Sequence, residues 1–404
     1  MIAVNDLDRV DLAQSSIPIT KVFIGEEELR AVQRPLESGW VVQGRYVAEF
    51  EEKFSRFTGA RNSVATTSCT TALHVVVAAL GLQAGDEVIV PGYTWISTAN
   101  VVEYMGAKPV FCDVDLATFN IDPAAIEPLI TERTVGLLPV HLFGLPAAMA
   151  PVMDLAAKHG LWVVEDCACS LGGIYDGRHT GTFGEAGCFS FHPRKSITTG
   201  EGGMITTQRD DLAELARSLR DHGASRSDYA RHTSDGAFLL SEYNTIGFNY
   251  RMTDIQGALG SAQMDRAADI LAERGRRARL YDEMLADVAW LYTPVVPENC
   301  VHGYQAYVCL FRPEEPSMDN VHRLHERRNM LMAELERRGV ATRQGTHSPV
   351  LSGFYSQRYD LRPEDYPQSV IADRLSIALP LFAQLTDAEQ ETVVRELRSA
   401  FENC

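Results

Sequence analysis

Short apolar runs alternate with segments of helical periodicity between about residues 60 and 210. The apolar runs have the length of buried strands and lie at 63–65, 87–90, 109–112, 135–140, 161–164, 187–191 and 204–206. Residues 71–80 and 122–130 are two of the helical segments, and the second begins with Asp122 in the N-cap position and Pro123 at the first helical position. This alternation predicts an α/β fold with a mainly parallel, seven-stranded sheet that carries helices on both faces.

The pattern changes after Thr253, where longer helical segments replace the short apolar runs. Residues 254–290 have the periodicity of one or two long helices, and the remaining elements are a strand at 305–311 and charged helices at 319–338 and 386–402. These elements predict a smaller α+β domain at the C-terminal end. A chain of 404 residues is also long enough for two domains.

We therefore divide the chain into three parts. The large domain is expected to cover residues 26–255, and the small C-terminal domain residues 256–404. The segment 1–25 that precedes them is expected to pack on the small domain or on a partner subunit.

The composition is that of a packed globular protein, with 45% hydrophobic and 23% charged residues. The formal net charge of −17 and the sequence pI near 5.1 indicate an acidic surface. Such a surface repels nucleic acids and anionic membranes, so we expect neither as a partner. The N-terminus lacks a basic segment followed by an apolar one, and no stretch reaches the roughly 18 apolar residues of a spanning helix. We therefore expect a cytoplasmic protein.

The cysteines predict neither a disulfide framework nor a metal site. All eight are scattered along the chain, and none form a CxxC pair. Cys167 and Cys169 are the closest pair, and their spacing is too short for the usual zinc sites. We interpret the cysteines as reduced thiols in a chain long enough to bury a core without crosslinks.

Ligands bind at the carboxyl ends of the strands in sheets of this kind, so the residues after each apolar run are candidates for chemistry. Asp166 follows the run 161–164 in the sequence LWVVEDCACSLGG. A carboxylate at the end of a buried strand is costly unless it is paired. Asp166 can cap a helix or join a salt bridge, or it can face a protonated ring nitrogen, as pyridoxal phosphate (PLP) requires. Taken alone, this residue does not separate the two interpretations.

Lys195 follows the run 187–191 and precedes a glycine-rich turn in the sequence SFHPRKSITTGEGGMITT. Most lysines lie on the surface. Apolar and aromatic residues precede Lys195 and glycines follow it, which indicates a functional lysine in a binding site instead. A free lysine, with a pKa of about 10.4, is a poor nucleophile at neutral pH, and condensation with a cofactor as an imine makes it reactive. The segment is not a phosphate-binding P-loop, because Arg194 stands where that motif requires glycine.

Two further segments follow strand candidates. Residues 68–71 place hydroxyl and N–H groups at the expected start of a helix, where a phosphate dianion binds well, although simple N-capping is common there. Trp95 or Tyr93, after the run 87–90, can lie flat against an aromatic cofactor ring, although an isolated tryptophan belongs more often to the core. Phosphate loop, aromatic residue, acid and lysine each follow a strand in that order, and together they indicate a PLP enzyme.

Six motifs are specific enough to compare with known families, namely SGWVVQG, GDEVIVPGYTW, PVHLFGLPA, VVEDCACSLGG, SFHPRKSITTGEGGMITT and GFNYRMTDIQGALG. Together they resemble the DegT/DnrJ/EryC1/StrS aminotransferases, which make amino sugars and aminocyclitols. The resemblance covers nearly the whole chain, from about residue 17 to the C-terminus. It implies a PLP-dependent transferase of fold type I, and a homodimer with shared active sites at the subunit interface.

The resemblance implies roles for residues around the cofactor ring. Lys195 is similar to the Schiff-base lysine of the family, and Asp166 to the aspartate that pairs with the pyridine nitrogen. Trp95 matches the aromatic residue that covers one face of the ring. Tyr93 and His347 are expected to face the substrate, the second because GTHSP lies where family members have substrate-facing residues.

Other matched residues are expected to hold the phosphate group. Thr70 and Thr71 match the phosphate-binding pair that follows the first strand of the large domain. Ser190 matches a serine that reaches the phosphate. Asn249, in GFNYRMTD, matches the asparagine that reaches the phosphate of the neighbouring subunit.

Two positions depart from the family pattern. Cys169 stands where the family usually has a glutamine that binds the cofactor hydroxyl. Because a thiol is a weak donor, that contact is expected to be lost or to pass through water. Cys69 stands where the phosphate loop often has glycine, and its backbone N–H still serves if its φ is negative.

The resemblance implies that lysine at position 195 favours transamination, because some relatives carry histidine there and dehydrate without transaminating, although some lysine-bearing relatives do other chemistry. We expect a ping-pong reaction with an amino-acid donor, L-glutamate, and a keto-sugar acceptor linked to a nucleotide. The alternatives are a ketocyclitol (inosose) acceptor with glutamine as donor, and a PLP sugar dehydratase or oxidase that does not transaminate. The loops near 225–245 and 343–355 are expected to select the acceptor.

A PLP-binding regulatory protein is an alternative from a different class. Such a protein should carry an added DNA-binding segment with a basic face. The roughly 20 residues that precede the matched region contain no basic cluster, which argues against this alternative.

Overall fold

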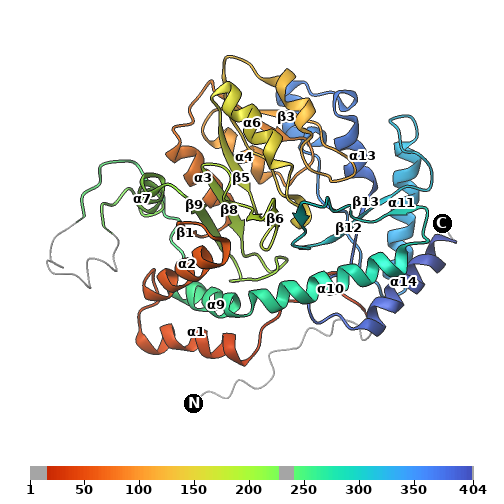
Figure 1. Cartoon of the computed structure of the whole chain (residues 1–404), viewed down its shortest axis with the longest axis horizontal. Coiled ribbons are helices and arrows are strands. Elements are labelled where there is room, and N and C mark those ends of the chain that lie inside the picture. The colour runs from red at the N-terminus through yellow and green to blue at the C-terminus, as the bar shows by residue number, and fades with distance from the viewer. Residues whose placement is uncertain (1–15, 227–240, 403–404) are drawn as a thin grey trace.

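The computed structural model describes residues 16–226 and 241–402. In its large part, helices cover a central sheet (Figure 1). Two consecutive helices, α9 (Asp254–Asp265) and α10 (Ala267–Leu285), run end to end across the lower half of the view, with α1 drawn below α9. They lead from the large part to a smaller part that ends with the C-terminal helix (Figure 1).

The central sheet has seven strands in the order β1-β9-β8-β5-β4-β2-β3. Their bounds are β1 Asn62–Thr66, β2 Glu87–Pro91, β3 Lys108–Cys112, β4 Thr134–Leu137, β5 Trp162–Asp166, β8 Ala186–Ser190 and β9 Gly203–Thr207. The strands from β3 to β8 in that order pair in parallel, whereas β9 lies antiparallel between β8 and β1. Each predicted apolar run therefore belongs to one mainly parallel sheet, and the predicted fold class is confirmed.

Seven helices of the large part surround this sheet within the described residues, and the first of them, α1, packs on α9. They are α1 Glu26–Ser38, α2 Arg45–Thr58, α3 Cys69–Ala79, α4 Ser97–Tyr104, α5 Pro123–Ile126, α6 Met149–His159 and α7 Asp210–Leu219. In α2, Phe50 and Phe54 lie one turn apart, and each ring is 4.9 Å from a ring of the β8 region, Phe191 and Phe189 respectively. Burying one such ring contributes about 1.5–3 kcal/mol. The helix ends at Gly59, whose φ of 74° is the left-handed conformation that favours glycine.

The helix predicted at 122–130 is shorter in the structure. Its start is confirmed, because the Asp122 carboxylate accepts a hydrogen bond of 3.0 Å from the N–H of Ala124. The α-helix ends at Ile126 and continues only as a 3-10 turn, Glu127–Leu129. Pro128 explains the difference, because proline has no N–H to continue the α-helical pattern.

The smaller part contains a three-stranded antiparallel sheet in the order β10-β12-β13. Its strands are β10 Leu291–Tyr292, β12 Tyr307–Phe311 and β13 Ser376–Leu379. Its helices, besides α10, are α11 Val321–Arg337, α12 Gly353–Tyr359, α13 Pro367–Leu375 and α14 Asp387–Phe401. A second small sheet joins β11 (Cys300–Val301) to β6 (Ile174–Tyr175) and β7 (Arg178–His179). The prediction of one or two long helices within 254–290 is confirmed as two, and the strand within 305–311 and the two charged helices are also present.

The strand predicted at 305–311 begins two residues later, at Tyr307. The buried guanidinium of Arg274, on α10, donates hydrogen bonds to the carbonyl groups of Tyr304 and Gln305. These carbonyls therefore bind a side chain instead of a neighbouring strand, and the sheet begins after them.

The N-terminal segment crosses to the smaller part within the described residues. Ile17 exchanges backbone hydrogen bonds with Gly339 and Ala341, of 2.7 and 3.0 Å, and the carbonyl of Ile19 accepts a bond of 3.1 Å from Leu381. Residues 1–15 of the predicted segment lie outside the described residues, as does most of the predicted loop 225–245. We propose the division at residues 25 and 255 as before. None of the helices in residues 16–226 and 241–402 is long and apolar enough to cross a membrane.

Candidate active site

A cavity of about 620 Å³ lies at the carboxyl ends of β5 and β8, beside the start of α3. Parts of its wall come from the smaller part of the molecule, through residues 343–347. The predicted site residues that line it are Thr70, Trp95, Asp166, Cys169, Ser190, Lys195 and His347. Thr71, Tyr93 and Asn249 do not belong to this lining. The fold thus assembles the cavity from segments that are far apart in the sequence.

Asp166 is the last residue of β5 and is only 4% exposed. Its carboxylate accepts hydrogen bonds of 2.8 Å from the hydroxyl of Thr98 and of 3.1 Å from the N–H of Ala168. The Cys69 thiol lies 3.9 Å from the carboxylate. Burial raises the pKa of Asp166 above its ordinary value, although both hydrogen bonds act to lower the pKa. Burial therefore keeps the ionised carboxylate costly despite these donors, and a cation in the cavity would stabilise it.

Lys195 sits on a tight loop that follows β8. Its N–H donates a bond of 2.8 Å to the carbonyl of His192, and the loop turns back at Gly200, whose φ is +79°. The Nζ atom donates to the Cys169 Sγ at 3.1 Å. Burial acts to lower the pKa of Lys195, but Cys169 and Asp166 outweigh it, so the pKa lies above its ordinary value. The amine and the acid thus belong to one electrostatic cluster.

The start of α3 forms another wall of the cavity. The N–H of Thr71 donates to the Ser68 hydroxyl at 3.2 Å, and the Ser68 N–H donates to the Thr71 hydroxyl at 2.9 Å. Thr71 therefore closes a capping box, whereas Thr70 reaches the cavity, where its hydroxyl donates to Ser97 at 2.9 Å. A Cβ at Gly203 would lie 2.3 Å from the Ser68 backbone, so only glycine lets β9 approach this loop. The helix N-terminus and its hydroxyls form a site suited to a phosphate group.

Trp95 and His347 lie together at the cavity. The Trp95 side chain is 57% exposed, which is unusual for an indole, and the two rings are 5.8 Å apart at 46°. The N–H of Thr94 donates a bond of 3.0 Å to the His347 carbonyl, which ties the β2 loop to the smaller part. An exposed aromatic face inside a cavity is available to a flat ligand.

Tyr93 and Asn249 lie elsewhere. Tyr93 is fully buried, its hydroxyl donates to Ser376 at 2.8 Å and accepts from the N–H of Thr346 at 3.0 Å, and burial raises its pKa. The geometry gives Tyr93 a packing position beneath the cavity loop, and a substrate contact there stays a prediction. Asn249 is exposed and forms an isolated backbone bridge with Asp221.

Polar residues that the sequence motifs alone did not single out also line the cavity; they include Arg194, Glu201, Gln305, Arg343 and Gln344. Arg194 and Arg343 are exposed, so two guanidinium groups stand at the rim. Only their position in the sequence points to these two arginines. Arg194 directly precedes Lys195, and Arg343 begins the loop that is expected to select the acceptor. A single arginine in a loop does not by itself indicate which cavity it faces.

The residues present fit PLP. Lys195 offers an amine, Asp166 a buried carboxylate with a raised pKa, and the start of α3 a phosphate site. Trp95 adds an exposed aromatic face, and the cavity is large enough for a small cofactor and part of a substrate.

Comparison with known proteins agrees with this geometry. Residues 22–398 match the DegT/DnrJ/EryC1/StrS aminotransferase family. The spore coat polysaccharide biosynthesis protein SpsC of Bacillus subtilis is 34% identical over 382 residues, which cover 95% of this chain and 96% of SpsC.

Solved structures are also similar over nearly the full length. PseC of Helicobacter pylori, an aminotransferase involved in the biosynthesis of pseudoaminic acid, superposes with a TM-score of 0.88 at 26% identity and covers 96% of this chain and 100% of its own. DesV of S. venezuelae, solved in complex with a ketimine intermediate, gives a TM-score of 0.85 at 30% identity, with 96% and 99% of the two chains covered.

Proposed function

Because the chain belongs to the DegT/DnrJ/EryC1/StrS aminotransferase family, we propose that it moves an amino group from L-glutamate to a nucleotide-linked keto sugar. The family makes it a PLP-dependent sugar aminotransferase. The donor, the nucleotide and the residue roles that follow are our proposal. The observation that carries them is the meeting of Lys195, Asp166 and the start of α3 in one cavity.

We assign each residue a role toward the cofactor. Lys195 holds the cofactor, and Asp166 keeps the ring nitrogen protonated, since a cation beside this carboxylate relieves the cost of its burial. Ser68, Thr70 and the N–H groups at the start of α3 hold the phosphate. When bound, PLP supplies an electron sink for the carbon that loses its proton.

Lys195 also moves protons. Its amine takes the α-proton of the amino donor in the first half-reaction and returns a proton to the acceptor carbon in the second. Cys169 lies 3.1 Å from this amine and acts on it directly. Trp95 covers the ring and keeps water from one side of it.

The two guanidinium groups at the rim suit anionic substrates. Arg194 and Arg343 offer planar donors that match a carboxylate or a diphosphate. An amino-acid donor carries the first group and a nucleotide-linked sugar the second. His347, beside Trp95, is proposed to contact the sugar.

Two relatives support a sugar acceptor. SpsC is a spore coat polysaccharide biosynthesis protein, and PseC is an aminotransferase involved in the biosynthesis of pseudoaminic acid. We also propose a cytoplasmic homodimer, in which Asn249 reaches the phosphate of the partner's cofactor. The exposed position of Asn249, away from its own cavity, supports that role.

The alternative acceptor is a ketocyclitol with glutamine as donor, and the alternative reaction is dehydration or oxidation without transamination. Product analysis separates them, because only transamination places nitrogen on the ring, and the ring identifies sugar or cyclitol. Initial rates with both substrates give parallel reciprocal plots for the ping-pong scheme. Intersecting plots would contradict it.

The first experiment is an absorbance spectrum of the purified protein with PLP, followed by addition of L-glutamate. We expect a band at about 410–420 nm that moves to about 330 nm as the amino group is transferred. Lys195→Ala should lose the first band. A band that ignores every amino donor would favour the non-transaminating alternative, and no band at all would refute the proposed function.

A further inference from the structure

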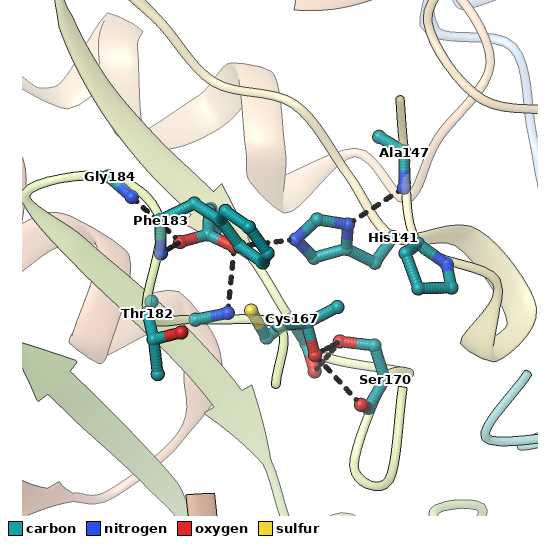
Figure 2. Close-up of polar contacts among 12 residues, drawn as sticks. His141, Ala147, Cys167, Ser170, Thr182, Phe183 and Gly184 are labelled. Carbon is teal, nitrogen blue, oxygen red and sulfur yellow. Dashed lines mark hydrogen bonds and ion pairs between the residues drawn. The ribbon is translucent and has the colours of Figure 1, made fainter. Parts of the chain in front are cut away.

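Behind the cavity, on the side of β5 away from it, lies a fully buried pair formed by His141 and Glu165. The His141 Nε2 atom is 2.9 Å from the Glu165 carboxylate. Figure 2 shows the imidazole of His141 pointing to a carboxylate that the chain around Thr182 to Gly184 also approaches. Neither residue lines the cavity.

The hydrogen bonds define the protonation of the pair. The N–H of Ala147 donates to the His141 Nδ1 atom at 3.0 Å, so that nitrogen is unprotonated and Nε2 carries the hydrogen (Figure 2). Besides His141, Glu165 accepts from the N–H groups of Gly181, Phe183 and Gly184 at 2.7, 2.8 and 3.0 Å. Burial acts to raise the pKa of Glu165, but these bonds outweigh it and hold the pKa below its ordinary value. The imidazole thus donates through Nε2 to the ionised Glu165 carboxylate.

This cluster is not arranged to bind a metal ion. The Cys167 sulfur lies within 4.8 Å of the possible ligand atoms of His141 and Glu165. However, both imidazole nitrogens and both carboxylate oxygens already have N–H or hydrogen-bond partners, and burial raises the pKa of the Cys167 thiol well above its ordinary value. A cation would have to displace those bonds.

The pair is connected directly to Asp166. The N–H of His141 donates to the Asp166 carbonyl at 3.0 Å, and the Asp166 N–H donates to the Pro139 carbonyl at 2.9 Å. Residue 141 thus holds the end of β5 twice, by its backbone at Asp166 and by its side chain at Glu165. Neighbouring residues of a strand point to opposite faces of the sheet. The contact of His141 with Glu165 on one face therefore also restrains the position of Asp166, which points to the cavity on the other face.

The same residue anchors a cavity wall. Its sequence neighbours Val140, Leu142 and Phe143 line the cavity, and Phe143 has a left-handed φ of 58°. A non-glycine residue in that conformation is retained only where its surroundings hold it. His141, whose side chain contacts Glu165 on the buried side, lies two residues before Phe143 in this wall.

We propose that His141 and Glu165 are a positioning pair for cofactor binding, which fixes the Asp166 carboxylate and the cavity wall 140–143. This inference rests on the proposed role of Asp166 toward PLP. Neither residue touches cofactor or substrate, so the effect of changing them passes through Asp166.

The test compares PLP binding by His141→Ala and His141→Gln with the unchanged protein. Absorbance titration gives the dissociation constant and the pH midpoint of the cofactor band, and thermal unfolding of the apo protein gives stability. We expect His141→Ala to weaken PLP binding at least about tenfold and to shift the pH midpoint. His141→Gln should restore most of both, because a carboxamide supplies an N–H at the place of Nε2.

His179→Gln is the matched control. His179 is also a buried histidine, but its ring bonds to the N–H of Gly172 and the carbonyl of Thr180, at 2.9 and 2.7 Å, and not to β5. The His179→Gln variant should lower the thermal stability of the apo protein without moving the pH midpoint of the cofactor band. If His141→Ala does not fold, the same measurements are made on Glu165→Asp, which keeps the negative charge but places it farther from His141.

Equal effects of the His141 and His179 changes on stability, with PLP affinity and pH midpoint unchanged, would overturn the positioning role while leaving the proposed function intact. An unchanged protein without any cofactor band would instead overturn the proposed function and this role with it. The two failures are therefore distinguishable in one titration.

Discussion

Two adjacent carboxylates at the end of β5, Glu165 and Asp166, are both buried, yet they are held in opposite ways. Glu165 accepts four N–H bonds, one from an imidazole and three from the backbone, and its pKa is lowered. Asp166 accepts hydrogen bonds from one hydroxyl and one N–H and a longer one, of 3.9 Å, from the Cys69 thiol, and burial raises its pKa. Burial alone therefore does not identify a functional acid. The acid that faces a cavity and has a raised pKa is the candidate for binding a ligand, and the neighbouring acid with four N–H donors is the candidate for positioning the first.

The largest expected effect is on activity, at Asp166. Asp166→Asn keeps the shape but removes the charge that holds the ring nitrogen protonated. We expect kcat/KM to fall by about 10²–10⁴-fold, measured with glutamate and a keto sugar. The thermal stability of the apo protein should not fall, because a costly buried charge has been removed. A variant of near-normal activity would contradict the assigned role.

The next effect is on stability, at Glu165. In Glu165→Gln an NH₂ group replaces one oxygen and faces N–H donors that previously had an acceptor. We expect the free energy of unfolding of the apo protein to fall by about 2–3 kcal/mol in urea denaturation. If Glu165→Gln left stability unchanged while Asp166→Asn lowered it, the two carboxylates would have exchanged roles.

The opposite pKa directions predict opposite responses to pH. The folded pKa of Glu165 is lowered, so its stabilising contribution is present above the ordinary value of about 4 and is lost as pH falls below it. The folded pKa of Asp166 is raised, so its contribution is present below about 4 and is lost as pH rises through the folded value.

Thermal unfolding of apo proteins across pH 3–7 checks this. The advantage of Asp166→Asn over the unchanged protein should grow as pH rises from about 4 and vanish below it. The deficit of Glu165→Gln should shrink as pH falls below about 4. Parallel curves for the two variants would argue against the assigned directions.

The smallest expected effect concerns Cys169, whose contact with Lys195 raises the pKa of that amine. Cys169→Gln, which introduces the side chain usual in the family, should lower the pKa of Lys195 and increase its unprotonated fraction at pH 7. We expect PLP capture by the apo protein to speed up by about two- to threefold, measured by stopped-flow absorbance. Cys169→Ser is the size-matched control, and slower capture in both variants would show that the thiol assists the reaction.

Much of the fold was readable from the sequence, because apolar periodicity is local. The central strands were all predicted within a few residues, since a strand buried on both faces is a continuous apolar run. The α-helix expected at 122–130 ends at Ile126, because Pro128 has no N–H to continue the α-helical hydrogen bonds. β12 begins two residues later than expected, because the carbonyl groups of Tyr304 and Gln305 accept hydrogen bonds from Arg274, about 30 residues earlier in the chain.

The candidate site was readable only in part. The motifs placed Lys195 and Asp166 at strand ends, where the structure brings them to one cavity. Tyr93 and Trp95, two residues apart, were both candidates by position to lie against the cofactor ring, yet Tyr93 is fully buried and Trp95 is 57% exposed. No local pattern separates them, because the partners of Tyr93, Ser376 and Thr346, come from the other end of the chain.

By itself the sequence determined the order of strands and helices and the chemical groups that follow each strand, because both depend on residues close together in the chain. The tertiary structure alone decided which of two adjacent acids has a raised pKa. That outcome depends on donors from residues 98, 141 and 181–184, which only the packing of distant segments brings to β5. A hydrogen bond acts over about 3 Å of space whatever the distance along the chain, and so the roles of Glu165 and Asp166 could be read only once the chain had folded.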